Sequence, residues 1–166
     1  MFQLKQLSPQ AIDAAMEKGK QYRALNEPRE AESICRDILA ADPHHQEAHI
    51  QLILALSDQF GEKLGQALEE SKKLIANLAS EYERAYYSGL ITERRAKAQL
   101  ARGTPGAGSV AYEGLLRAMR EYEKAESLRP EGDDNAILRW NTCARLIMDS
   151  HHLQPEPADH PHPMLE

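Results

Sequence analysis

The apolar residues of this chain fall in helical patterns. One example is the segment near residue 140, where Ile137, Trp140, Ala144 and Ile147 share one face of a helix. No segment alternates between apolar and polar residues in the manner of a half-buried strand. We therefore predict an all-α fold. The predicted helices cover residues 9–25, 28–42, 46–59, 64–79, 81–102, 110–128 and 133–149.

Proline and glycine set most of these boundaries. Ser8 followed by Pro9 is typical of an N-cap with proline at the first helical position, where its missing N–H is no loss. Pro43 and Pro130 each end a helix. The Gly103–Ser109 segment, with three glycines and a proline, predicts a connection between two helices.

The pattern stops at Ser150. The segment from there to the C-terminus contains four prolines and four histidines and few apolar side chains. Such a segment cannot bury enough surface to offset the entropy of ordering it. The sequence therefore predicts one helical domain over residues 1–149 and a disordered tail over residues 150–166.

Composition narrows the function classes. The net charge is −6, of which three negative charges lie in the tail, so the helical part is nearly balanced and has no general field to attract nucleic acid. No apolar run reaches the 18 or so residues that a membrane span needs. Cys35 and Cys143 stand far apart beside apolar residues, which predicts two reduced core thiols. By elimination, we expect a cytoplasmic protein that binds neither nucleic acid nor membrane.

A repeat is visible in the first and last helix pairs. Gly19, Tyr22, Ala31 and Pro43 follow the order and spacing G-x-x-Y, A and P of a helix pair of about 34 residues. The interval from Ala118 to Pro130 equals the interval from Ala31 to Pro43. In these features the chain resembles the tetratricopeptide repeat (TPR) family. The resemblance covers about residues 9–149.

The middle pair departs from this pattern. Ala67 follows Ala31 at close to the length of one unit, but no proline ends the pair. Ala118 follows Ala67 at about one and a half units, and the excess coincides with a long helix and the Gly103–Ser109 segment. In the third unit Gly89 is the candidate small residue of the first helix, although Thr92 follows where tyrosine is expected.

Several other patterns bear on chemistry. The Gly103–Ser109 loop lacks the Lys-Ser/Thr pair of a phosphate-binding loop. His45 and His49 share a helix face but are too few for a structural zinc site. No pattern typical of a catalytic centre is present. The basic residues of the 93–97 run and Arg102 fit either a solvated face or an anion-binding wall. We expect no cofactor, no metal site and no enzymatic activity.

The resemblance implies a TPR-like α-solenoid of about three antiparallel helix pairs with a C-terminal capping helix. It also implies a concave groove, lined by the first helix of each pair, that receives a segment of another protein. Projected onto this sequence, the groove residues are Met16, Lys20, Arg23, Ile50, Leu54, Tyr86, Leu90 and Arg94. The expected function is a protein-interaction scaffold. The alternatives are a chaperone of the bacterial secretion type and a regulatory domain that binds a small ligand. The partner and the oligomeric state are not specified by the sequence.

Overall fold

The computed structural model describes residues 1–156, and these form seven α-helices and no strand. The helices are α1 (Ile12–Ala24), α2 (Pro28–Ala41), α3 (Gln46–Ser57), α4 (Phe60–Ala76), α5 (Glu81–Ala101), α6 (Ala107–Leu128) and α7 (Asn135–Asp149), after a single 3₁₀ turn at Pro9–Ala11. The all-α prediction is confirmed for these residues. None of their helices is both long and apolar enough to cross a membrane.

Two helices begin at a residue whose side chain caps them. His45 caps α3 by accepting a hydrogen bond from the Ala48 N–H (3.1 Å), and Ser80 caps α5 by accepting one from the Glu83 N–H (3.3 Å). Two helices begin earlier than predicted. α4 begins at Phe60 and has non-helical backbone angles at Lys63 (φ −135°, ψ 53°), so the regular helix resumes where it was predicted. α6 begins three residues early because Gly106 takes a left-handed conformation (φ 78°) that turns the chain directly into the helix.

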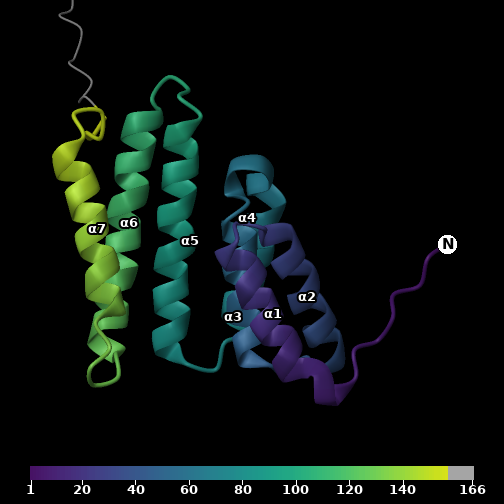
Figure 1. Cartoon of the computed structure of the whole chain (residues 1–166). Helices are drawn as coiled ribbons and strands as arrows, with labels where there is room; N and C mark the ends of the chain where they lie inside the picture. Colours follow the sequence, from purple (N-terminus) through teal and green to yellow (C-terminus); the bar gives the residue numbers. More distant parts are fainter. Residues whose placement is uncertain (157–166) are drawn as a thin grey trace, which may run out of the picture.

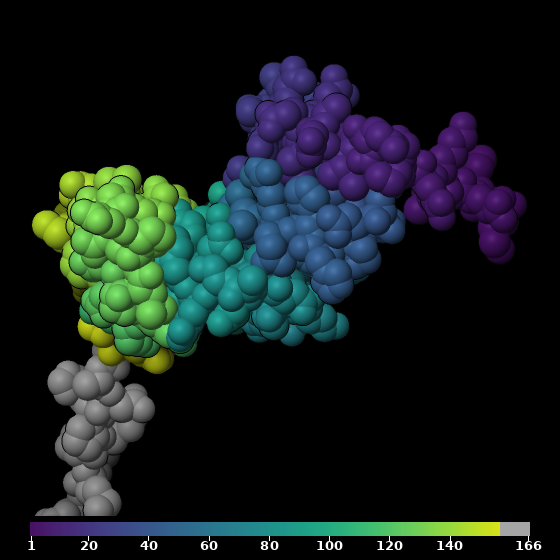
Figure 2. Space-filling view, turned by 90° about the horizontal axis from the view of Figure 1, so that it is seen from below, coloured from purple at the N-terminus to yellow at the C-terminus, as the bar shows by residue number. Residues whose placement is uncertain are grey.

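The helices follow one another across the molecule in chain order. Each packs against the next, and additional contacts join α1 to α3, α3 to α5 and α5 to α7. On the other side, α2 and α4 are joined by the ion pairs Arg36–Glu70 and Arg29–Glu62, each 2.7 Å long. Figure 1 shows α5, α6 and α7 upright at one end and α1 to α4 at the other, and Figure 2 shows the same order from below. The odd-numbered helices are thus spatial neighbours.

The α5–α6 hairpin is longer than the α1–α2 hairpin. Gly19 lies in the second half of α1, whereas more than half of α5 follows Gly89. Likewise, Ala31 lies in the first turn of α2, whereas Ala118 lies near the middle of α6. Most of the excess length in the sequence pattern therefore extends the two helices, each by about two turns.

The core has one part rich in leucine and isoleucine and another rich in alanine. The first includes Leu52, Ile53 and Leu56 of α3 and extends to Leu90 and Ile91 of α5. The second lies between α5, α6 and α7 and is built mainly from alanines packed around Tyr122. Cys35 and Cys143 are fully buried free thiols, one in each part, as the sequence predicted.

The start of the predicted tail belongs to this body. Leu153 is only 3% exposed and packs in the alanine-rich part of the core, and the carbonyl of His152 lies against Gly108 at the start of α6. The predicted boundary at residue 150 overlooked this because a single leucine shows no periodicity. Residues 157–166 of the predicted tail lie outside the described part of the chain.

Candidate functional site

The predicted groove residues come from α1, α3 and α5, which the fold places side by side. Six of the eight keep part of their surface accessible: Lys20, Arg23, Ile50, Leu54, Tyr86 and Arg94. These six partly exposed residues lie on three neighbouring helices, and we call the surface that they define the α1–α3–α5 face.

The structure removes Met16 and Leu90 from that face. Met16 is 3% exposed and packs with Ile38 and Ala48, and Leu90 is 4% exposed within the leucine-rich core. Glu93, three residues after Leu90 on α5, has no exposed surface either. The projection assumed an average repeat geometry, and these three side chains instead turn into the contacts between helices.

Lys20 joins α1 to α3. Its ammonium pairs with Glu47 of α3 and lies 2.8 Å from Glu17 Oε1 on its own helix. Hydrogen bonds to Glu17 and Glu47 raise the pKa of Lys20 above its ordinary value. All three side chains are at least one-third exposed, so the pairs contribute little to stability. The three side chains place one positive and two negative charges on the surface beside the apolar residues of α3.

Asp58, just after α3, binds both arginines of the face. Arg23 Nε lies 2.6 Å from Asp58 Oδ2, and Arg94 pairs with the other carboxylate oxygen. Arg94 also donates to Ser57 Oγ (2.6 Å) and to the Leu54 carbonyl oxygen (3.2 Å). The negative pole at the end of α3 favours the two cations that gather there. One carboxylate therefore connects α1, α3 and α5.

Sequence reasoning did not identify Ser57 or Asp58 as part of the face. Both follow the last apolar turn of α3, and no motif marks them. Their role depends on Arg23 and Arg94, which lie 35 residues before and 36 after Asp58. The only available signal was the position of an acidic residue at a helix end, where a basic residue is usually preferred.

The apolar part of the face consists of Ile50, Leu54 and a group of tyrosines on α5. Tyr86 stacks on Tyr82 (ring centroids 6.0 Å apart) and meets the edge of Tyr87 (5.1 Å). Burial raises the pKa of Tyr87 to about 12, so its hydroxyl stays protonated at neutral pH. Half-buried tyrosines beside aliphatic side chains offer rigid contact area with hydroxyl groups for hydrogen bonding.

The other predicted candidates have local structural partners. His45 caps α3, and the His49 ring nitrogen Nε2 lies 2.9 Å from the Pro43 carbonyl oxygen. Within residues 1–156, no group of three or more metal-ligating side chains gathers at one point. Trp140 is partly buried against the alanine-rich core and donates from Nε1 to Glu123 Oε1 at 3.0 Å.

The basic run at 93–97 is divided among several environments. Arg94 turns toward Asp58, whereas Lys97 pairs with the buried Glu93, and Arg95 remains exposed on the surface of α5. A single basic wall, one of the two interpretations of this run, therefore does not form from these residues alone.

Comparison with known protein families, curated proteins and solved structures finds no match to this chain. The site is therefore interpreted from its own geometry.

Proposed function

We propose that this chain is a TPR-like repeat domain that binds a segment of another protein along the α1–α3–α5 face, without catalysing a reaction. The observation that supports this most is the adjacency of the odd-numbered helices, each of which contributes accessible side chains. In a stack of helix pairs, alternate helices form a continuous surface long enough for a peptide.

The composition of the face favours a segment with an apolar anchor. Ile50, Leu54 and the α5 tyrosines are its apolar residues, and its three cations are already paired with Glu47 or Asp58. Because those pairs are satisfied within the domain, a partner gains most from the apolar and aromatic contacts. Charge then contributes mainly to orientation.

Site-specific photo-crosslinking tests this proposal. A photoreactive phenylalanine analogue replaces Ile50 in one variant and Leu54 in another, and Val110, 47% exposed on α6, serves as the matched control. After irradiation in native lysate, we expect one protein to be crosslinked from positions 50 and 54 but not from position 110.

The crosslinked protein is then purified and titrated against the wild-type domain and the Ile50→Asp variant. We expect Ile50→Asp to weaken binding at least tenfold, about 1.4 kcal/mol, while the circular dichroism spectrum is unchanged. Equal crosslinking from all three positions, or unchanged affinity, would mean that recognition takes place elsewhere.

A further inference from the structure

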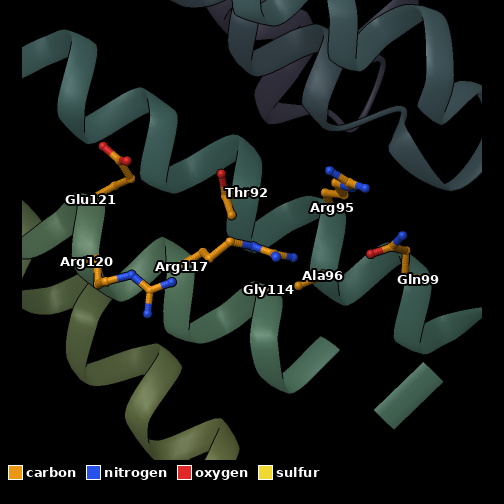
Figure 3. A pocket seen from close by; sticks show the side chains of 8 residues that line it. All are labelled: Thr92, Arg95, Ala96, Gln99, Gly114, Arg117, Arg120 and Glu121. Atoms are coloured by element: carbon orange, nitrogen blue, oxygen red, sulfur yellow. The ribbon is translucent and has the colours of Figure 1, made fainter. Parts of the chain in front are cut away.

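A second surface feature lies between α5 and α6, away from the α1–α3–α5 face. A hollow of about 380 Å³ is lined there by Arg95 of α5 and by Arg117 and Arg120 of α6. Figure 3 shows these side chains around the hollow, with Thr92 and Glu121 at one end and Gln99 at the other. The sequence did not reveal this cluster because Arg95 and Arg117 are far apart along the chain and belong to different helices.

Small residues form the floor of the hollow. Gly114 of α6 lies directly against Ala96 of α5, and a Cβ atom added to Gly114 would come within 2.8 Å of the Ala96 Cβ. In Figure 3 both residues lie between the arginines. Because neither residue at this helix contact has a bulky side chain, the contact leaves the hollow unfilled, and the longer arginine side chains surround it.

The three arginines differ from most other arginines within residues 1–156 because none of them has a carboxylate oxygen within 4 Å. Six arginines of this part of the chain do have one: Arg23, Arg29, Arg36, Arg94, Arg129 and Arg139. Within residues 1–156, neither Arg95 nor Arg117 nor Arg120 has such a partner, although Glu121 lines the same hollow. Three like charges around one hollow repel one another, and an anion bound among them relieves that repulsion.

The charge and the geometry indicate the kind of anion. Three guanidinium groups and one carboxylate leave a net charge of +2, which matches the dianion of a phosphate monoester above its second pKa of about 6. The planar fork of arginine pairs its N–H groups with two oxygens of a phosphoryl group at once. The hollow also has more room than a phosphoryl group alone needs. We therefore propose that Arg95, Arg117 and Arg120 bind the phosphoryl group of a phosphate monoester.

This site is independent of the proposed peptide-binding face. Successive residues of a helix are about 100° apart, so Thr92, Ala96 and Gln99 lie on the side of α5 away from Leu90 and Arg94. A segment bound on the α1–α3–α5 face leaves the hollow open. Failure of either proposal therefore leaves the other standing.

Titration with inorganic phosphate tests the site directly. The probe is added to ¹⁵N-labelled protein at pH 7.5 and low salt, and the arginine Nε–Hε signals are followed, with acetate as the comparison anion. We expect phosphate to shift a subset of these signals at concentrations at which acetate does not. The double variant Arg95→Gln with Arg117→Gln should bind phosphate at least tenfold more weakly.

The control variant is Arg102→Gln with Arg145→Gln, which removes two exposed arginines that also lack a carboxylate partner within residues 1–156 but do not line the hollow. Its phosphate affinity should stay within twofold of wild type. Equal losses in both double variants would show a general effect of net charge and overturn the proposal. Equal binding of acetate and phosphate by the wild-type protein would overturn it as well.

Two further probes distinguish the source of the phosphoryl group. One is a short alanine peptide with a central phosphoserine, compared with its serine form, and the other is adenosine monophosphate. Tighter binding of the phosphopeptide than of phosphate identifies a modified protein segment, and tighter binding of the nucleotide identifies a small metabolite. If neither phosphate ester binds better than acetate, the hollow is not a phosphoryl site.

Discussion

The α1–α2 and α5–α6 hairpins differ in how closely their two helices approach each other at a glycine of the first helix. In the first, a Cβ atom added to Gly19 would meet Ile34 at 3.4 Å, an ordinary van der Waals distance. In the second, a Cβ atom at Gly89 would lie 2.7 Å from the Tyr122 ring, which is closer than real side chains approach. The helices of the longer hairpin therefore approach more closely at Gly89 than those of the shorter hairpin do at Gly19, and the core beside Gly89 consists mainly of alanines.

Close packing in the α5–α6 hairpin is accompanied by a buried polar network. Tyr122 donates to Glu93 Oε2 at 2.6 Å, and the same carboxylate lies 3.2 Å from Arg139 of α7, while its other oxygen binds Lys97. Burial and the neighbouring carboxylate raise the pKa of Tyr122, which keeps its hydroxyl protonated as a donor. Where apolar side chains are small, directional contacts specify how the helices align.

The largest expected effect comes from removing the centre of that network. Glu93→Ala leaves Arg139 and the Tyr122 hydroxyl without their partner, which should cost about 3–5 kcal/mol of unfolding free energy. Urea denaturation measures it. Glu70→Ala, which removes the α2–α4 pair with Arg36, should cost less than about 1 kcal/mol because both side chains are partly exposed. Similar losses of unfolding free energy in Glu93→Ala and Glu70→Ala would show that the buried network is no more important for stability than a surface ion pair.

Leu153 should also be important for stability, although it lies beyond the last helix. Leu153→Ala removes a buried side chain from the alanine-rich core, which should lower the unfolding free energy by about 2–3 kcal/mol. Gln154→Ala, at an exposed neighbouring position, is the control and should have almost no effect. Unchanged stability of Leu153→Ala in thermal unfolding would contradict the burial of this residue.

Alanine substitutions at three glycines should have effects of different sign. Gly89→Ala forces a methyl group into the Tyr122 ring and should destabilise the protein by about 1–3 kcal/mol. Gly65 in α4 has open space around its Cβ position, so Gly65→Ala should stabilise by about 0.5–1 kcal/mol through helix propensity. Gly19→Ala should have a smaller effect than either, because its methyl group meets Ile34 at 3.4 Å, the short end of ordinary van der Waals contact. Chemical denaturation of the three variants checks the order, and a stabilising Gly89→Ala would disprove the difference between the hairpins.

A modest effect is expected on the pH dependence of stability, since one buried thiol lies in each part of the core. Burial raises the pKa of Cys35 to about 11 and that of Cys143 to about 12, from 9.0. The folded state therefore holds these protons more tightly than the unfolded state. The resulting stability is complete below pH 9 and is lost as the pH rises toward 11 and 12.

Replacing either cysteine by alanine should make stability less sensitive to alkaline pH. Between pH 8 and pH 10, the loss of unfolding free energy should be about 1 kcal/mol smaller in each variant than in wild type. Comparing each variant with wild type cancels the contribution of the tyrosines, which titrate in the same range. An unchanged pH profile for one variant would show that its thiol is accessible to water.

Most of the fold could be predicted because its signals are local. Pro28, Pro43 and Pro130 mark helix boundaries through their immediate neighbours alone. The two helices that begin earlier than predicted do so at a kink and at a left-handed glycine. The candidate face was predicted less completely. Which side of α1 or α5 faces a neighbour depends on how those helices rotate in the packed structure, so Met16 and Leu90 were assigned to the surface although they are buried.

The contacts between distant residues could not be predicted at all. Asp58 binds Arg23 and Arg94, and Arg95 lies near Arg117, only because separate helices come together. No residue spacing within one helix specifies such pairs. The buried Glu93 is a related case, since its sequence neighbours in the 93–97 run are typical of a solvated helix.

The bridge at Asp58 also has a mechanical consequence. A row of helices can change its curvature when neighbouring helices slide or tilt, and the resistance depends on how they are tied together. Here one carboxylate joins α1, α3 and α5 at the end of α3, so these helices cannot spread at that point without separating opposite charges. A change of curvature that spreads α1, α3 and α5 at residue 58 therefore has to break these ion pairs.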